Sequence, residues 1–387
     1  MRINMTQTPD HDSTEYHARP NRFDIDLGAV AIFTRNIRNL IGRDATIFAA
    51  LKCNAYGFGL EPVARTVLRS GADALSMVDR ANAIGLRKAG ITAPILVYPG
   101  AVVTVETVAA VEAYDLIPSI IDLEAAATYS RRATRPLRIA VKVDIGQERL
   151  GFPAEEAAEA IAVISRMPNL QVHIVHSHPN TPEPHSTEYL NWQLDRFEAM
   201  CRQLQEQHVT IPIKMIASSK ILSITRGLVL NAVDPGQMLF GPFRAEGDVP
   251  WPATRQAFKK LSSRLIHVRA LRRQSFADQA PFGVREGMRM GIIPMGSADG
   301  ADRLTRGEVL VRGRRVKLIG KPSLEHTRLD LTDIPEAKIG DEVVLIGEQD
   351  GDAITPETVA THCGLGRIAD LAMAVGHGIP RRYIEVE

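Results

Sequence analysis

The chain has 387 residues, of which 45% are hydrophobic, 24% charged and 5% aromatic. This composition is typical of a globular protein and excludes a disordered chain, a collagen-like repeat and a disulfide-rich scaffold. The 46 Lys and Arg residues balance 45 Asp and Glu residues, so the formal net charge is +1. A chain so nearly neutral has no electrostatic support for binding nucleic acid.

The N-terminal residues and the cysteines indicate the cellular compartment of the protein. Residues 1–22 are polar and lack the apolar core of a signal peptide, so they predict a flexible tail. No apolar stretch approaches about 18 residues, the length of a membrane span. The three cysteines, Cys53, Cys201 and Cys363, are widely spaced and odd in number, which indicates a reducing compartment. We therefore expect a cytoplasmic protein that binds no membrane. A separate expectation is that Cys53 fills the core.

Short apolar runs alternate with amphipathic segments from about residue 46 to residue 240. The runs are rich in Val, Ile and Leu, as expected of strands buried on both faces. They lie at 47–52, 74–78, 94–98, 116–120, 137–143, 172–176, 213–216 and 230–233, with helices predicted at 60–69, 81–89, 154–166 and 190–207. About eight such units predict a closed (β/α)8 barrel. An open doubly wound sheet is the alternative, but the segment KCNAYGFG after the first run is not the GxGxxG of a Rossmann fold.

The pattern changes after Pro250, Trp251 and Pro252. Several segments there alternate with period two, which predicts strands, and the stretch 308–319 with its Arg-Gly-Arg turn predicts a hairpin. The predicted strands are 264–271, 288–295, 308–319, 327–331, 342–346 and 382–386. We therefore predict a tail over 1–22, a barrel over 23–245 and a mostly β C-terminal domain over 246–387.

Candidate catalytic groups follow the predicted barrel strands, whose carboxyl ends form the active face of such a fold. Lys52 ends the first strand beside apolar residues, where a lysine can form a Schiff base. Hydroxyls and a glycine follow the seventh and eighth strands, a setting that suits a phosphate group. A lysine opposite a phosphate cradle suggests pyridoxal phosphate as cofactor. The residues at these strand ends are Lys52, Lys142, Asp144, Arg149, His176, His178, Ser218, Ser219, Asp234, Gly236 and Gln237.

Several stretches resemble one known family. The run ALKCNAYGFGLEPVA at 50–64 resembles the cofactor-lysine motif of alanine racemases, the two-domain pyridoxal-phosphate enzymes of fold type III. VKVDIGQERLGF at 141–152 resembles their K-x-D-x-G-x-x-R-x-G motif. GIIPMGSADG, GEVLVRGRRVKLIGKPS and LDLTDIP, between residues 291 and 335, resemble successive parts of their β domain. The similarity runs in order from about residue 22 to residue 383.

The resemblance implies a role for each matching residue. Lys52 would hold pyridoxal 5'-phosphate as an internal aldimine and exchange a proton at the substrate Cα. Arg149 would lie near the cofactor's phenolic oxygen and the substrate carboxylate, and Lys142 would orient it. His178 would stack near the ring. In the alternative alignment of this segment, His176 would take that role. The phosphate would be lined by Tyr56, Ser218 (where the family usually has asparagine), Ser219, Gly236 and the backbone of Gln237.

Two departures concern the proton chemistry. Racemisation in the family uses a second base, a tyrosine from the partner's β domain, but this chain has no tyrosine between 190 and 382, and Phe282 occupies the best local match. Asp234 stands where the family carries an arginine; an aspartate favours a protonated pyridine nitrogen, because the opposite charge stabilises the cation. Glu325 and His326 are the candidate replacement acids or bases.

We therefore expect a pyridoxal-phosphate-dependent isomerase of amino-acid metabolism, a racemase or epimerase that acts at Cα, working as a homodimer with shared active sites. The alternative is different Cα or Cβ chemistry on the same fold, as in a decarboxylase, an aldolase or a β-eliminating lyase. A non-catalytic cofactor-binding protein is a third hypothesis, which the presence of a β domain disfavours. We expect no catalytic metal, because the first strand carries Lys52 rather than the H-x-H of metal-dependent hydrolases.

Overall fold

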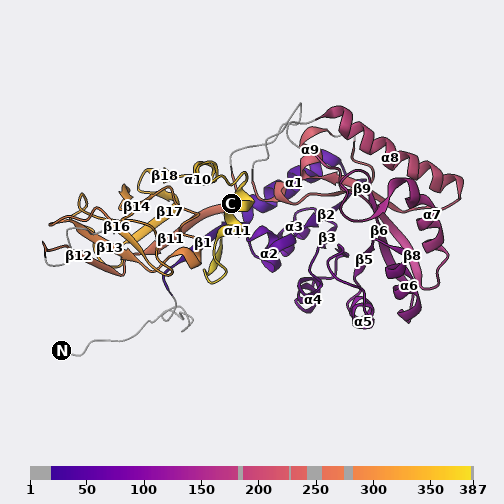
Figure 1. Ribbon diagram of the computed structural model, residues 1–387, viewed down its shortest axis with the longest axis horizontal. Coiled ribbons are helices and arrows are strands. Elements are labelled where there is room, and N and C mark those ends of the chain that lie inside the picture. The colour runs from indigo at the N-terminus through magenta and orange to yellow at the C-terminus, as the bar shows by residue number, and fades with distance from the viewer. Residues whose placement is uncertain (1–18, 182–185, 226–227, 242–254, 274–281, 385–387) are drawn as a thin grey trace. The chain divides into compact units, whose positions relative to one another are not determined.

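The computed structural model describes residues 19–181, 186–225, 228–241, 255–273 and 282–384 (Figure 1). The chain divides into two compact units. One comprises Asp26–Phe258 with Tyr383–Glu387, and the other comprises Met1–Ile25 with Lys259–Arg382. Each unit has its own sheets and is described separately below.

The first unit is a closed barrel of eight parallel strands. The strands pair in the order β5-β4-β3-β2-β10-β9-β8-β6, and β5 also pairs with β6, which closes the ring. They are β2 (Thr46–Ala50), β3 (Ala74–Met77), β4 (Ile95–Val97), β5 (Ile117–Ile120), β6 (Leu137–Asp144), β8 (Leu170–His176), β9 (Ile213–Ser218) and β10 (Ala232–Asp234), with the two-residue β7 (Phe152–Pro153) added on β6. The barrel predicted from the apolar runs is thereby confirmed.

The barrel interior is a packed layer with one buried residue from each strand. The layer mixes large and small side chains, so that neighbouring strands fill the space without gaps. Its members are Phe48, Ala74, Leu96, Ile117, Ala140, Ile174, Met215 and Ala232. Because the interior is filled, a ligand can reach only the ends of the barrel.

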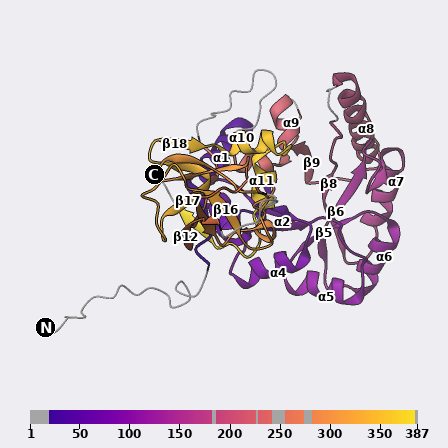
Figure 2. The same cartoon turned by 60° about the vertical axis from the view of Figure 1, so that its left-hand side comes forward.

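Helices cover the outside of the barrel strands (Figure 2). Several begin at a side chain that accepts a hydrogen bond from a free backbone N–H, as Asp26 does from Ala29 and Ser186 from Tyr189. The helices are α1 (Leu27–Ile41), α2 (Lys52–Tyr56), α3 (Leu60–Arg69), α4 (Arg80–Lys88), α5 (Val105–Ala113), α6 (Leu123–Arg132), α7 (Ala154–Ser165), α8 (Thr187–Glu206), α9 (Ser219–Ile224) and the short turn η1 (Gln237–Leu239). None of the helices in the described part of the chain is long and apolar enough to span a membrane.

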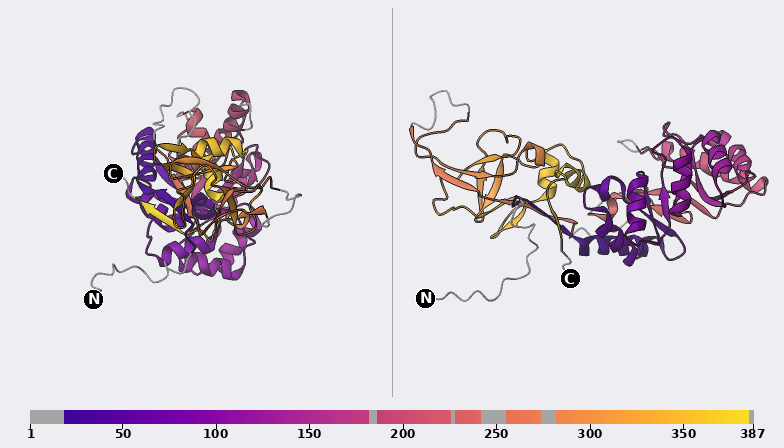
Figure 3. Two further views of the ribbon diagram at one scale, coloured as in Figure 1. Left: turned by 90° about the vertical axis from the view of Figure 1, so that its left-hand side faces the viewer. Right: turned by 90° about the horizontal axis from the view of Figure 1, so that it is seen from below.

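The second unit is mostly β, drawn largely in orange and yellow in Figure 3. Its larger sheet has the order β15-β14-β17-β11-β1-β19, with β18 paired to β17, and its smaller sheet has the order β12-β13-β16. The strands are β1 (Arg22–Asp26), β11 (Phe258–Arg264), β12 (His267–Ala270), β13 (Arg289–Ile293), β14 (Glu308–Val311), β15 (Arg314–Lys317), β16 (Thr327–Asp330), β17 (Glu342–Gln349), β18 (Asp352–Ile354) and β19 (Arg381–Ile384). The turn η3 (Ser297–Asp299) and the helices α10 (Pro356–His362) and α11 (Ile368–Ala374) complete it.

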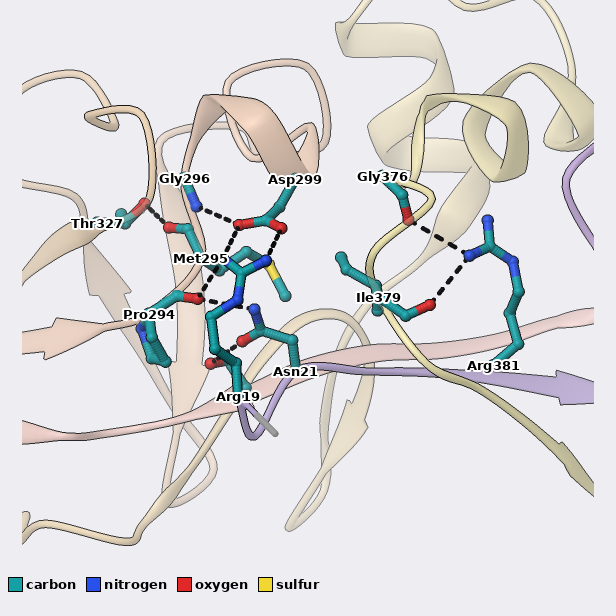
Figure 4. A network of polar contacts seen from close by, with 11 residues as sticks. Arg19, Asn21, Pro294, Met295, Gly296, Asp299, Thr327, Gly376, Ile379 and Arg381 are labelled. Atoms are coloured by element: carbon teal, nitrogen blue, oxygen red, sulfur yellow. Dashed lines mark hydrogen bonds and ion pairs between the residues drawn. The ribbon is translucent and has the colours of Figure 1, made fainter. Parts of the chain in front are cut away.

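An ion pair anchors the start of the described chain to this β unit (Figure 4). The Arg19 guanidinium donates hydrogen bonds of 2.9 and 2.8 Å to the carboxylate of Asp299, which is 2% exposed. The Asn21 side chain donates to the carbonyl of Pro294 at 2.7 Å. Asp299 also accepts a bond from the Gly296 N–H, at 3.0 Å. The carboxylate therefore ties the GSADG turn to a segment nearly 280 residues away.

The structure changes some predicted bounds. The predicted strand 264–271 is divided: β11 ends at Arg264 in the larger sheet, and β12 begins at His267 in the smaller one. β1 was not predicted as a strand, and it pairs in the sheet of the β unit, although the predicted boundary assigns residues 23–25 to the barrel. The predicted hairpin over 308–319 is present as β14 and β15.

Candidate active site

A pocket of about 260 Å3 lies at the carboxyl ends of the barrel strands. Lys52 stands two residues after β2, Tyr98 directly follows β4, and Asp234 ends β10. These strand ends meet on one face because all the barrel strands run parallel. The pocket is lined by Lys52, Val78, Tyr98, Pro99, Lys142, Arg149, Leu150, His176, Ser177, His178 and Asp234. The structure thus brings together six of the predicted site residues: Lys52, Lys142, Arg149, His176, His178 and Asp234.

Lys52 is followed by a left-handed turn of four residues that are not glycine. The φ angles of Cys53, Asn54, Ala55 and Tyr56 lie between 51° and 55°. For an L-residue this conformation costs about 1–2 kcal/mol, so four in succession indicate a site whose surroundings enforce the strain. One stabilising contact is the Asn54 side chain, whose Oδ1 accepts the Leu60 N–H at 2.8 Å. The prediction that Cys53 fills the core is wrong: it is exposed.

A cradle of small groups lies beside the left-handed turn. The Ser219 Oγ accepts the backbone N–H of Gly236 at 2.8 Å and that of Met238 at 3.2 Å. Both lone pairs of the hydroxyl are thereby engaged, and its own hydrogen remains available to an anion. A Cβ on Gly236 would lie 2.3 Å from the Tyr56 hydroxyl oxygen, so this backbone must be glycine. Ser218 is also buried, directly before Ser219.

Asp234 is the buried acid of the pocket, with 6% of its surface exposed. Its Oδ2 accepts a hydrogen bond of 2.8 Å from the Tyr98 hydroxyl. Its Oδ1 is buried with no hydrogen-bond partner among the described residues. Burial raises the pKa of Asp234 to about 6, although Lys52, the Tyr98 hydroxyl and Lys142 favour the charged carboxylate. A buried acceptor without a donor is costly, which is what a site built for a ligand N–H would show.

Lys142 and Arg149 belong to β6 and the loop that follows it. Burial lowers the pKa of Lys142 to about 8. Asp144 shapes the loop, because its carboxylate accepts the N–H groups of Gly146, Gln147 and Arg149 at 2.8 to 2.9 Å. Burial alone would raise the pKa of Asp144, but these N–H donors outweigh it and the pKa is lowered. The loop thus places the exposed Arg149 at the pocket with a fixed backbone.

Two histidines line the pocket in different ways. His176 is 1% exposed, its Nε2 lies 2.8 Å from the Ser119 Oγ, and its ring packs against Tyr98 with centroids 5.4 Å apart. His178 is less buried, and desolvation, followed by the charge of Lys52, lowers its pKa to about 3. A neutral, partly open ring such as His178 suits stacking on a flat ligand better than the enclosed His176.

Tyr98 is one pocket residue that the sequence prediction missed. It packs partly buried against the barrel core, and the Lys52 Nζ lies 4.8 Å from its ring centroid. A tyrosine at the end of the predicted strand 94–98 was the available signal, but its partner Asp234 lies 136 residues away.

Glu325 and His326 lie in the β unit, not in the barrel. Both are exposed, in a turn closed by the Ser323 N–H donating to the His326 carbonyl at 2.8 Å. Phe282, in the same unit, is 39% exposed, and the Arg328 guanidinium lies 3.9 Å from its ring centroid. The catalytic roles of Glu325 and His326 stay predictions. No cluster of three His, Cys, Asp or Glu side chains in the described ranges could hold a metal ion.

Comparison with known proteins agrees with this fold. The family profile of the alanine racemase N-terminal domain matches residues 25–243, and that of the alanine racemase C-terminal domain matches residues 259–383. The alanine racemase of Desulforamulus reducens is 30% identical over 372 residues, which cover 93% of this chain and 98% of that protein. Alanine racemase 2 of Caldanaerobacter subterraneus subsp. tengcongensis is 29% identical over 382 residues, 95% of each chain.

Solved structures show the same similarity. The alanine racemase of Clostridium difficile superposes with a TM-score of 0.84 at 26% identity, covering 95% of this chain and 96% of that one. The alanine racemase of Bacillus anthracis with bound L-Ala-P superposes with a TM-score of 0.83 at 25% identity, covering 95% of each. Two domain profiles that together span nearly the whole sequence show that this chain belongs to the alanine racemase family.

Proposed function

We propose that the protein is a pyridoxal-phosphate-dependent racemase or epimerase that acts at the Cα of an amino acid. The observation that carries the proposal is the pairing of Lys52 with Asp234 in one pocket. A primary amine is needed to hold the aldehyde carbon of the cofactor, and a buried acid suits its ring nitrogen.

The residues present fit this cofactor. The Oδ1 of Asp234 is a buried acceptor without a partner, as a ring N–H would require. The Tyr56 hydroxyl leaves no room for a side chain at position 236, so the backbone there is accessible. The Ser219 hydroxyl can donate to an anion at this place. We assign the phosphate to this cradle, with Tyr56, Ser218, Ser219, Gly236 and the Gln237 backbone around it. When bound, the cofactor supplies an electron-withdrawing ring that stabilises negative charge at the substrate Cα.

The residues of the chain would carry the remaining work. The Lys52 amine would remove the Cα proton of the substrate on its own face. Asp234 would stabilise positive charge on the ring nitrogen. Arg149 would bind the substrate carboxylate, since a guanidinium matches a carboxylate with two parallel hydrogen bonds. The neutral His178 would pack on the ring, and Lys142 would lie with Arg149 in the pocket lining.

The residue that carries out the second proton transfer has still to be assigned. Racemisation needs a base on the opposite face, and Phe282 has no titratable group to serve there. We propose Glu325 or His326 as the replacement, delivered within a homodimer. A second candidate function, supported by Asp234 in place of the family's arginine, is other Cα or Cβ chemistry with Lys52 as the single base: decarboxylation, aldol cleavage or β-elimination.

The test uses purified protein supplied with pyridoxal 5'-phosphate and a panel of L- and D-amino acids, with products resolved by chiral chromatography. We expect a visible cofactor band and both enantiomers from either starting one. Lys52→Ala should lose the band that lysine produces, while Lys88→Ala, which removes an exposed lysine of α4, should leave it unchanged. Consumption of one enantiomer with release of carbon dioxide, an aldehyde or a keto acid would favour the second candidate. Failure to bind the cofactor would contradict both.

A further inference from the structure

A hydrogen bond crosses the barrel mouth and has no part in the functions assigned above. The Tyr98 hydroxyl, at the end of β4, donates to the Asp234 Oδ2, at the end of β10, over 2.8 Å. β3 and β2 lie between these two strands in the sheet order, so the bond spans the inside of the ring and not a neighbouring pair. Both residues line the same pocket.

The bond divides the Asp234 carboxylate into two unlike oxygens. Oδ2 is occupied by the Tyr98 hydroxyl, whereas Oδ1 is buried with no partner in the described ranges. A carboxylate has two acceptor oxygens, and fixing one of them fixes the direction of the other.

The Tyr98 ring is itself held from two sides. The Lys52 Nζ lies 4.8 Å from its centroid, and the His176 ring lies 5.4 Å away with the two planes at 50°. His176 is oriented in turn by Ser119, with Nε2 and Oγ 2.8 Å apart. The hydroxyl therefore reaches Asp234 from a constrained ring, and its orientation does not depend on Asp234 alone.

We propose that Tyr98 is a positioning residue, which holds Asp234 through Oδ2 so that Oδ1 is the oxygen that receives the ring N–H of the bound cofactor. This inference rests on the proposed cofactor. It gives Tyr98 a role toward Asp234 and none in proton transfer at the substrate.

The charges around Asp234 explain why a hydroxyl suits this position. Lys52 from α2 and Lys142 from β6 favour the carboxylate, and Tyr98 adds a neutral donor. Burial works against all three. Since O–H donation to a carboxylate favours its charged form, loss of the hydroxyl should both free the carboxylate to rotate and favour its protonation. A protonated Asp234 could no longer stabilise a cationic ring nitrogen.

The experiment compares the full-length protein with Tyr98→Phe and with the control Tyr114→Phe. Tyr114 also belongs to the barrel unit but does not line the pocket. In the apoprotein, carbon NMR of the Asp234 carboxyl, assigned with Asp234→Asn, follows its titration. We expect the pKa of about 6 to rise in Tyr98→Phe and to stay in Tyr114→Phe.

A second readout uses nitrogen NMR of isotope-labelled pyridoxal 5'-phosphate bound to each protein. We expect a protonated ring nitrogen in the wild type and in Tyr114→Phe, and a smaller protonated fraction in Tyr98→Phe. The rate of Cα proton exchange should fall by about tenfold, the effect of one charge-assisted hydrogen bond. If Tyr98→Phe does not fold, 3-fluorotyrosine in place of Tyr98 keeps the shape, makes the hydroxyl a stronger donor and should lower the pKa of Asp234.

The outcomes separate the inference from the proposed function. A wild type that binds the cofactor, together with Tyr98 variants that change neither the Asp234 titration nor the ring nitrogen, would overturn the inference and leave the proposed function standing. A wild type that binds no cofactor would overturn both.

Discussion

A Cβ atom placed on Gly236 would lie 2.3 Å from the hydroxyl oxygen of Tyr56. The two residues come from opposite ends of the barrel sequence, one from the left-handed turn after β2 and one from the loop after β10. Their contact places a bare backbone next to a phenol hydroxyl, with the Ser219 hydroxyl bonded to the same glycine. An anion bound in this cradle would meet hydroxyl groups and no side chain of residue 236.

Gly236→Ala should therefore weaken cofactor binding. The added methyl must displace Tyr56 or the loop, a strain that costs about 1–3 kcal/mol. The middle of that range corresponds to a loss of roughly thirtyfold in affinity. The measurement is a titration with pyridoxal 5'-phosphate followed by absorbance. Gly85→Ala is the control, because a Cβ there meets nothing within 4 Å, and in the helix α4 the change should slightly stabilise the protein. Equal affinity in both variants would contradict the assignment of the cradle.

Asp234→Asn should impair function and raise the stability of the apoprotein near neutral pH. Because the folded pKa of about 6 lies above the ordinary aspartate value of 3.8, the folded chain keeps a proton between these pH values that the unfolded chain releases. The contribution of Asp234 to the unfolding free energy is thus highest below pH 3.8 and falls as the pH rises to 6, by on the order of 3 kcal/mol.

The measurement is denaturant unfolding of apoprotein at a series of pH values. The advantage of Asp234→Asn over the wild type should grow through that window and be complete near neutral pH. A constant difference between the two proteins would show that Asp234 titrates normally.

Lys142→Met should show the opposite pH dependence. The pKa of Lys142 is lowered by burial from 10.5 to about 8, so the unfolded chain holds a proton between these values that the folded chain has lost. The wild type should therefore gain stability, relative to Lys142→Met, as the pH rises from 8 to 10.5. Unfolding of apoprotein across this range measures the difference. No change with pH would mean that the ammonium is solvated in the folded chain.

Asp299→Ala should destabilise the β unit. The substitution removes both hydrogen bonds from Arg19 and leaves the Gly296 N–H without its acceptor (Figure 4). Since Arg19 is 40% exposed and can return to water, we expect about 2 kcal/mol. Asp370→Ala, which breaks an ion pair with the exposed Arg367, is the control and should cost less than about 1 kcal/mol. A similar loss of stability in both variants would mean that the Arg19–Asp299 pair contributes no more than an exposed ion pair.

The barrel could be predicted from the sequence because a strand buried on both faces needs a continuous apolar run. The ends of those runs then placed Lys52 and Asp234 on one face. The strand β1 could not be found in this way, since its partners β11 and β19 lie more than 230 residues away in the chain. The segment RFDID carries little signal of its own.

The missed parts of the site depend on tertiary contacts. Nothing in the letters CNAY requires four left-handed residues, because asparagine alone among them tolerates that conformation readily. The Tyr98–Asp234 bond joins strands that are not neighbours in the sheet. Strand-end reasoning found the aspartate but had no means of pairing it with the tyrosine.

We propose that Lys52 and Asp234 serve one cofactor-dependent reaction at the substrate Cα. The most direct measurement is exchange of the Cα proton in deuterated water, with single enantiomers of amino acids as substrates and products resolved on a chiral column. We expect deuterium at Cα in the wild type with pyridoxal 5'-phosphate, both enantiomers in the product, and loss of exchange in Lys52→Ala. Wild-type protein that binds the cofactor yet exchanges no Cα proton with any amino acid would contradict it.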